Sequence, residues 1–384
     1  MLNNPMNQFP AAHTAKPRSN NAIKIIFGVV AALIALLLGL IVLFLIGVET
    51  GLVAFLIGIV SAVLPVPIYL ILVIWIDRYE SEPAWMLATA FLWGALVAVF
   101  FAFLINTASE LSVVLLTNDV KAGRAFGAVI SAPIVEEVSK ALILFIYFFW
   151  KKDEFDGVID GIVYAAMVGL GFAMTENIQY YGKAVLQSGS GGLTLVFIIR
   201  GALSPFAHPM FTSMTGIGLG LALHARNAFL RFLAPIVGLL VAISMHSIWN
   251  GSAVLFGGPG FILMYLLIMI PAFAIMFVVI FLALRREGKI IGEHLTPDFR
   301  AGLFTQEEYL QLCTVRGRMG ASYNAFSRGG LGHWKARRQL NQIASELAFH
   351  RNRLARGISV EDAREREASY QQALHELLKR LRAN

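Results

Sequence analysis

The sequence predicts an all-α membrane protein, a polytopic bundle of about eight helical spans followed by a helical, basic cytoplasmic tail. Of the 384 residues, 57% are hydrophobic and only 14% are charged, which is too apolar for a soluble globular protein. Apolar runs recur through the first three quarters of the chain, and each is long enough to cross a hydrocarbon core of ~30 Å. The last hundred residues are instead polar and basic.

Eight apolar segments are candidate spans: 23–48, 52–76, 83–106, 125–150, 158–180, 193–223, 232–255 and 261–284. The segment 193–223 is interrupted by Arg200, His208 and two prolines, so we interpret it as one crossing with an irregular entry. The first segment is too long for a signal-peptide core, and we expect a retained anchor. We therefore expect a disordered N-terminus at 1–21, a membrane domain at 22–284 and a tail at 285–384.

Basic residues indicate the orientation. They cluster before the first span, after the fourth, after the sixth and after the eighth: Lys16, Arg18, Lys24, Lys151, Lys152, Arg226, Arg231, Arg285, Arg286 and Lys289. Because cytoplasmic loops carry an excess of Lys and Arg, these clusters predict that both termini are cytoplasmic. The assignment requires that 193–223 crosses the membrane once.

The tail differs in composition from the rest of the chain. It contains 18 Lys and Arg against 11 Asp and Glu, an excess equal to the net charge of +7 of the whole chain. We expect helices at 305–312, 335–356 and 360–381, a linker at 317–332, and an anionic lipid surface as the partner of the tail. Nucleic acid is not expected, since no aromatic platform or recognition motif accompanies the charge. The single cysteine, Cys313, excludes intrachain disulfides and cysteine-based zinc sites.

Two adjacent carboxylates, Glu136 and Glu137, lie inside the fourth span. An ionisable group at that depth costs about 2.5–3.5 kcal/mol on insertion scales, so a pair of them indicates proton chemistry, ion transit or a catalytic site. Lys140 shares a helix face with Glu136 and can neutralise one carboxylate, which leaves Glu137 to find another partner. Pro133 is expected to kink this helix. A purely structural ion pair is the alternative interpretation.

Other polar groups lie on three further spans. The segment 158–180 carries Glu176 and Asn177 beside a stripe of small residues at 157, 161, 165, 169 and 173, which should let a neighbouring helix approach closely. Arg200 is expected to pair with Glu176 or to extend to the interface. His208 stands alone between two prolines. His246 and Asn250 are four residues apart on one face, so Asn250 could orient the imidazole or face an oxyanion.

These groups lie at similar depths in the outer half of the predicted bilayer, which is what a shared site requires. Two carboxylates, two histidines and an amide, without an evident serine or cysteine nucleophile, indicate an activated water. The reaction class would be amide hydrolysis inside the membrane, with one glutamate as general base. The close variant is metal-assisted hydrolysis with His208, His246 and Glu136 as ligands. Zinc is then the candidate, although the H-E-x-x-H spacing is absent.

Five features, in this order and on successive segments, together resemble the PrsW family of intramembrane proteases: Asp77-Arg-Tyr-Glu-Ser-Glu-Pro83, Glu136-Glu-Val-Ser-Lys140, Phe172-Ala-Met-Thr-Glu-Asn177, the isolated His208, and His246-Ser-Ile-Trp-Asn250. The resemblance covers roughly residues 52–255. That family is related to the type II CAAX prenyl endopeptidases and the bacteriocin-processing membrane proteases.

The resemblance implies a role for each site residue. Glu136 would activate water, Glu137 would support it, and His208, His246 and Asn250 would bind an oxyanion or a metal, with Lys140, Glu176 and Asn177 in supporting positions. Glu176 stands where the CAAX enzymes have a histidine, so a CAAX-type substrate is not expected. The resemblance also implies a bacterial inner-membrane enzyme that makes the first cut in a single-span anti-sigma factor.

Two other classes of function fit the same residues. A proton-coupled transporter would use buried carboxylates and histidines, but it favours inverted repeats, and the sequence contains none that we detect. A non-catalytic membrane scaffold could retain the bundle without the chemistry. Replacement of Glu136 by Gln separates these classes, because only a protease should lose peptide cleavage.

Overall fold

The computed structural model describes residues 21–151, 154–357 and 362–383. The elements of the membrane part are α1 (Asn21–Thr50), α2 (Leu52–Val63), α3 (Val66–Ile76), α4 (Ala84–Leu92), η1 (Trp93–Ala98), α5 (Val99–Thr117), α6 (Val120–Phe126), η2 (Gly127–Ser131), α7 (Ala132–Trp150), α8 (Val158–Phe197), η3 (Ile198–Leu203), α9 (Ala207–His224), α10 (Ala228–Met264), η4 (Tyr265–Met269) and α11 (Ile270–Arg300). The tail continues with α12 (Gln306–Leu312), α13 (Val315–Ala355) and α14 (Ala363–Arg382). The predicted all-α class is confirmed over the described residues.

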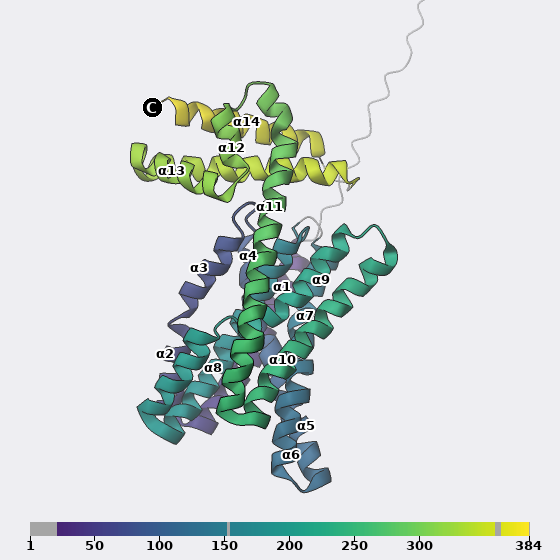
Figure 1. Cartoon of the computed structure of the whole chain (residues 1–384), viewed down its shortest axis with the longest axis vertical. Coiled ribbons are helices and arrows are strands. Elements are labelled where there is room, and N and C mark those ends of the chain that lie inside the picture. Colours follow the sequence, from purple (N-terminus) through teal and green to yellow (C-terminus); the bar gives the residue numbers. More distant parts are fainter. Residues whose placement is uncertain (1–20, 152–153, 358–361, 384) are drawn as a thin grey trace, which may run out of the picture.

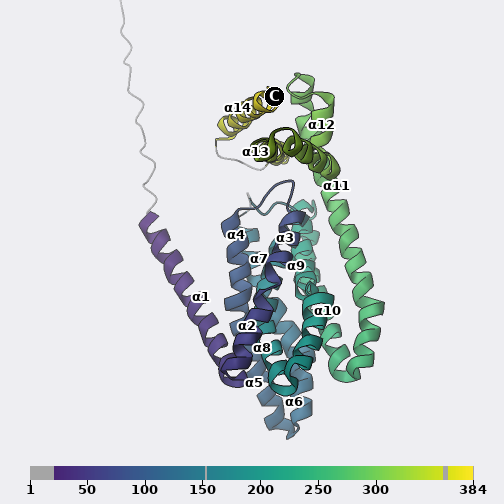
Figure 2. The ribbon, with the colours of Figure 1, turned by 90° about the vertical axis from the view of Figure 1, so that its left-hand side faces the viewer.

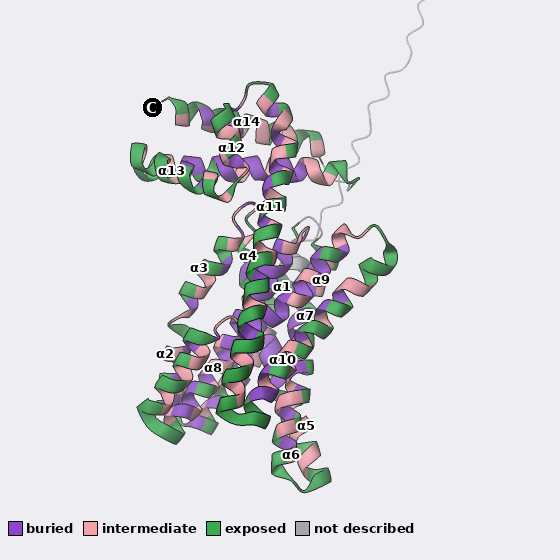
Figure 3. Cartoon of the chain, in the orientation of Figure 1, coloured by how far each residue is buried: buried purple, intermediate pink, exposed green. Residues whose placement is uncertain are grey.

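The long helices form a bundle, and α12, α13 and α14 gather beyond one end of it (Figures 1 and 2). The first half of α1 diverges from the bundle, whereas α5 and α6 project from the end opposite the tail (Figure 2). Exposed residues cover the outer helices, and buried residues concentrate in the middle of the bundle (Figure 3). The exposed side chains of α1, α10 and α11 are largely Leu, Ile, Val and Phe, as a lipid-facing surface requires.

Within the described residues, five helices are long and apolar enough to cross a membrane: Ile25–Thr50, Leu52–Ile76, Ala84–Thr117, Val158–His224 and Ala228–Arg300. The last two contain 67 and 73 residues, more than twice what one crossing needs. Each is broken at a glycine with positive φ, Gly189 at 61° and Gly257 at 64°. After the second break the chain reverses at η4, and α11 runs back towards the tail end of the bundle (Figures 1 and 2). The chain is therefore a multi-pass membrane protein.

The predicted stripe of small residues forms the contact between α8 and α9. A Cβ atom on Gly161 would lie 2.2 Å from the carbonyl oxygen of Gly216, and one on Gly216 would lie 2.0 Å from that of Gly161. One on Gly169 would lie 2.6 Å from the nitrogen of Pro209. Backbones that approach this closely leave room only for hydrogen, so the stripe fixes the position of α9 and of the histidine it carries.

Four π-helical segments interrupt the membrane helices in the described part of the chain, and side chains from other elements bond to carbonyl oxygens of three of them, η1, η2 and η3. Thr175 donates to Ala95 of η1 at 2.9 Å, Asn250 to Ala128 of η2 at 2.9 Å, Tyr265 to Leu203 of η3 at 2.8 Å, and Tyr69 to Gly201 of η3. Such segments often mark functional sites. The kink predicted at Pro133 is instead the π-helical turn η2, which ends at Ser131. The irregular entry predicted for 193–223 is η3 and the break before α9.

The tail departs from the prediction in two places. Helix α11 continues without a break through the expected boundary at 284–285 as far as Arg300. The predicted linker at 317–332 is wrong, since these residues belong to α13, which breaks only at Gly329 and Gly330. The content of Gly and Ser indicated a linker, but Arg318 and Ala321 of this stretch are buried, and Arg318 lies over Tyr79. Residues 1–20, for which we predicted disorder, and 360–361, the start of the predicted last helix, lie outside the described residues.

Side chains of the tail anchor it to the loop 77–83. The guanidinium of Arg353 lies 3.3 Å from Glu80 and 3.1 Å from Asp156. Arg318 is buried and lies over the ring of Tyr79, at 4.5 Å from its centre. Apolar residues of α13 and α14 join the core that contains Tyr79 and Met86. Some of the basic side chains of the tail therefore contact residues of this protein and do not face solvent or lipid.

We predict that Gly161→Ala lowers the thermal stability of the purified protein in detergent. The new methyl group would overlap the backbone of α9, and overpacking of this kind typically costs about 1–3 kcal/mol. Gly28→Ala is the matched control, because a Cβ atom there meets nothing within 4 Å. Equal melting temperatures for the two variants would show that the helices can separate at no cost.

A second prediction concerns Asp77, which is 3% exposed and accepts the backbone N–H of Glu82 at 2.7 Å. Burial raises its pKa from 3.8 to about 8. Because the folded state then holds a proton that the unfolded state releases, this contribution to stability is complete below pH ~4 and is lost as the pH rises towards 8. Asp77→Asn keeps the acceptor oxygen without titrating. Its melting temperature relative to the parent should increase between pH 5 and 9, and a constant difference would contradict the prediction.

Candidate active site

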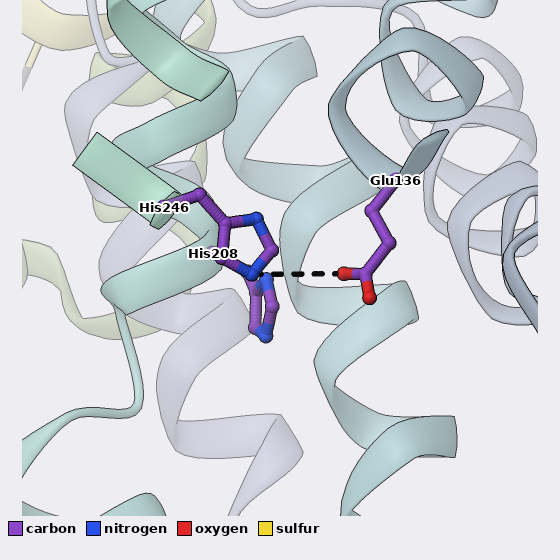
Figure 4. A group of neighbouring side chains, drawn as sticks. All are labelled: Glu136, His208 and His246. Atoms are coloured by element: carbon purple, nitrogen blue, oxygen red, sulfur yellow. Dashed lines mark ion pairs between the residues drawn. The ribbon is translucent and has the colours of Figure 1, made fainter. Parts of the chain in front are cut away.

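Glu136, His208 and His246 come from three helices, α7, α9 and α10, and point towards one another (Figure 4). One ligand atom of each lies within 4.8 Å of those of the other two, and all three residues are buried. Nε2 of His246 is 3.8 Å from Oε2 of Glu136. The convergence that the sequence predicted is observed in the structure.

The ammonium group of Lys140 lies at the centre of the site. Its Nζ is 2.9 Å from Oε1 of Glu137 and 3.3 Å from Oε2 of Glu136. The predicted pair of Lys140 with Glu136 is present, and Lys140 also contacts Glu137, for which we had expected only other partners: the side chain of lysine is long and flexible enough for the ammonium to reach both. The same group lies 3.8 Å from the ring centre of Phe172, a favourable contact of a cation with an aromatic face.

Glu137 has hydrogen-bonding partners at both carboxylate oxygens, in addition to Lys140. Its Oε2 accepts the hydroxyl of Thr212 at 2.8 Å, and its Oε1 lies 3.0 Å from Nδ1 of His246. A carboxylate accepts hydrogen bonds, so this contact assigns the proton of His246 to Nδ1 and leaves the lone pair of Nε2 facing Glu136. Glu137 therefore orients the imidazole.

His208 is held at both nitrogens. Its Nδ1 lies 3.0 Å from Nζ of Lys140, and its Nε2 lies 3.0 Å from Oε2 of Glu176. An ammonium can only donate, so Nδ1 accepts and Nε2–H donates to the carboxylate. Glu176 also pairs with Arg200, as the sequence predicted, and Arg200 binds Asn177 as well. Glu176 and Asn177 thus hold the entry to α9 in place.

Asn250 does not orient His246, which was one of the two roles expected for it. Its Nδ2 donates to the carbonyl oxygen of Ala128 in η2 at 2.9 Å, since the π-helical turn presents that oxygen to α10. The bond ties α10 to the segment that precedes the glutamate pair. Asn250 still lines the same cleft as Glu136.

Two contacts of the site were not assigned from the sequence. Thr212 bonds Glu137, and Phe172 lies under the ammonium of Lys140. Both positions are four residues from a predicted site residue, Thr212 after His208 and Phe172 before Glu176. Helical spacing could have identified both, because residues four apart share a helix face.

A cleft of about 1180 Å³ leads to the site. Helices α1, α5, α7, α8 and α10 contribute to its walls, and Glu136 and Glu176 lie within it. Its lining combines apolar side chains with polar groups such as Asn106, Arg200 and Asn250. A cleft of this size can admit a segment of polypeptide with its backbone amides beside the carboxylate of Glu136.

The donor set fits a metal ion. Two imidazoles and a carboxylate form the His₂Glu combination of catalytic zinc sites, and Glu137 behind His246 is the carboxylate that such ligands usually have. Lys140, however, contacts both Glu136 and Nδ1 of His208. An ammonium and a divalent cation cannot occupy the same space, so an ion would require the lysine side chain to move.

A multi-pass helical bundle with a buried Glu, His, His group at the end of a large cleft defines a class of membrane-embedded hydrolases. The profile of a family described as "PrsW family intramembrane metalloprotease" matches residues 82–276, half of the chain. The chain belongs to the PrsW family of membrane peptidases, as its motifs predicted.

Curated relatives named "Protease PrsW" agree with this assignment. The protein of Geobacillus kaustophilus (strain HTA426) is 34% identical over 146 residues, which are 38% of this chain and 58% of the relative. That of Clostridioides difficile (strain 630) is 32% identical over 193 residues, 49% of this chain and 76% of the relative. That of Bacillus subtilis (strain 168) is 29% identical over 177 residues, 46% and 71%. No solved structure matches the chain.

We predict that Lys140→Met strongly destabilises the protein. Removal of one partner from a buried ion pair typically costs about 3–5 kcal/mol, because the remaining charge stays buried and uncompensated. The matched control is Lys183→Met, since Lys183 pairs with Glu49 at a half-exposed position, where a salt bridge contributes at most about 1 kcal/mol. Thermal unfolding in detergent compares the two variants.

The same variants show whether a divalent ion can replace the ammonium. Zn²⁺ should raise the melting temperature of Lys140→Met more than that of Lys183→Met if Glu136, His208 and His246 bind it. Equal responses would argue against metal binding by this group.

Proposed function

We propose that this protein is an intramembrane endopeptidase that hydrolyses a peptide bond of a membrane-anchored protein. The observation that carries the proposal is the buried convergence of Glu136, His208 and His246 at the end of the cleft. Family membership supports the same reaction class.

Glu136 is the proposed general base. It lines the cleft, whereas Glu137 is fully buried and already binds Lys140, Thr212 and His246. A water beside Glu136 would give it a proton while the oxygen attacks the scissile carbonyl carbon. The carboxylic acid then returns the proton to the leaving amine, so the charge balances over the two steps. Glu137 keeps its neighbours in position.

Positive or hydrogen-bonding groups would stabilise the oxyanion that forms in the first step. Lys140 is the nearest cation to Glu136 and can donate to the oxyanion. Nε2 of His246 faces the same place with a lone pair, so it can accept a hydrogen bond from the attacking water but cannot donate to the oxyanion. The amide of Asn250 lines the cleft but is committed to Ala128. We therefore assign Lys140 a larger part in stabilising the oxyanion, and Asn250 a smaller part, than the resemblance implied.

Zinc is the proposed metal for the metal-assisted version. His208, His246 and Glu136 would hold the ion, which would supply Lewis-acid polarisation of the carbonyl and the water. The two versions use Glu136 differently, as a base in one and as a ligand in the other. A chelator separates them.

The substrate that we propose is a single-span membrane protein, an anti-sigma factor by resemblance to the family. The orientation follows from the basic loops: about eight crossings, with both termini on the cytoplasmic side of a bacterial inner membrane. Tryptophans at the ends of α3, α4 and α7 that face the C-terminal tail support this position of the cytoplasmic interface. They are Trp75 and Trp85, which are half-exposed, and Trp150, which is more exposed.

We predict that Glu136→Gln lowers the rate of cleavage of a single-span substrate in proteoliposomes by at least about 100-fold, since general-base catalysis typically contributes 10²–10⁴-fold. The melting temperature should stay high because Gln keeps the size of the side chain. Glu110→Gln is the control, a carboxylate of the same cleft that pairs only at 4.0 Å with exposed Arg124. It should retain activity.

Unchanged cleavage by Glu136→Gln would refute the assignment of the base. Loss of activity with a chelator, restored by Zn²⁺, would favour the metal-assisted version. Substrate flux across the vesicle membrane without peptide cleavage would favour a transporter.

A further inference from the structure

The excess positive charge of the tail lies almost entirely in one stretch. Residues 309–345 contain six Lys and Arg and no Asp or Glu, whereas the remainder of the tail contains 12 against 11. The stretch ends α12 and forms about the first three quarters of α13. The tail is therefore polarised, with a basic α13 and helices of mixed charge around it.

The first half of α13 presents apolar side chains to the outside. Met319, Tyr323 and Phe326 are 49%, 71% and 48% exposed and follow the i, i+4, i+7 spacing of one helix face. Arg316 lies on the same face, and Arg328 follows Phe326 by two residues, directly before the break at Gly329 and Gly330; both arginines are exposed. We call the residues Arg316, Met319, Tyr323 and Phe326 the outer face of α13.

The opposite face of this helix is anchored to the protein. Arg318 donates to the carbonyl oxygen of Leu312 at 2.8 Å and covers Tyr79, and Ala321 is buried. The helix is thus fixed with its apolar residues outward, which is the reverse of what a helix on a water-exposed domain does. An exposed apolar face of this kind needs something to cover it.

The position of the outer face indicates what covers it. The sulfur of Met319 lies 3.4 Å from Nη1 of Arg78, which is two residues past the end of the span Leu52–Ile76. Arg78 in turn lies 4.4 Å above the ring of Trp75, an aromatic residue of the kind that marks a membrane interface. Both views place α13 between the bundle and α14 (Figures 1 and 2). The outer face is therefore at the depth of the lipid headgroups.

We propose that the outer face of α13 inserts into the anionic lipid leaflet on the tail side of the bundle. The apolar residues enter the boundary between headgroups and acyl chains, and Arg316, Arg328, Lys335 and Arg338 contact lipid phosphates. This is the arrangement of amphipathic interfacial helices. Each basic group near an anionic surface strengthens the binding. The charge and the depth both favour lipid over a second copy of this chain.

Spin labelling of the full chain in proteoliposomes tests the proposal. The label is placed at Phe326→Cys, or at Gln372→Cys on exposed α14 as the matched position, both in a Cys313→Ala background. In vesicles with phosphatidylglycerol, the label at 326 should be more accessible to oxygen than to a water-soluble nickel chelate, and the label at 372 should show the reverse. In vesicles of phosphatidylcholine alone, accessibility of position 326 to the chelate should rise.

Charge reversal measures how much the basic side chains contribute to the binding of α13 to the membrane. Arg316→Glu with Arg328→Glu should move the label at 326 towards water, whereas Arg364→Glu with Lys379→Glu on α14 should leave it unchanged, although the net charge changes equally. Chelate accessibility at 326 as high as at 372 in anionic vesicles would overturn the proposal. Protection that depends on the density of protein in the vesicles would also overturn it, in favour of a second copy. Neither readout depends on peptidase activity.

Discussion

The ammonium of Lys140 is the constraint on which the site depends. It is the only cation in contact with both Glu136 and Glu137 among the described residues, and it also binds Nδ1 of His208. A buried pair of carboxylates is unfavourable without such a partner, because desolvation and mutual repulsion act together. The lysine therefore allows the pair to exist and also fixes the tautomer of one histidine. Stability and catalytic geometry share one side chain.

Close backbone packing places the other ligands around that charge. Gly161, Gly169 and Gly216 let α8 and α9 touch, so His208, on the first turn of α9, projects directly towards α7. The carbonyl oxygens released by η1, η2 and η3 would be costly in lipid, and hydroxyl and amide groups of other helices bind them. Asn250 is one of these amide groups, since its bond to Ala128 joins α10 to η2, the segment that leads into α7 and the glutamate pair. The irregular helices are thus stabilised by the same contacts that position the site.

Much of this arrangement could be predicted because membrane segments and charges leave strong patterns. The costly residues Glu136, Glu137, His208 and His246 stand out in apolar runs, and the spacing of small residues indicated a close helix contact. The bridging of both carboxylates by Lys140 could not be predicted, because the reach of a flexible side chain depends on the helices opposite it. The bond of Asn250 depended on a π-helical turn that no spacing indicates. The helix at 317–332 was missed because its glycines resemble a linker, while Tyr79 and Asn341, distant in sequence, hold it in place.

The charged groups of the site bear on the choice between the general-base and the metal-assisted mechanism. Glu136, Glu137 and Glu176 are three carboxylates, and among the described residues the two cationic side chains in contact with them are Lys140 and Arg200. The carboxylates outnumber the cations by one, so Glu136 shares its cation with Glu137 and can accept a proton from water as a general base. A divalent ion held by Glu136, His208 and His246 would instead replace the ammonium of Lys140 beside these groups. The position of the Lys140 side chain would therefore decide between the two mechanisms.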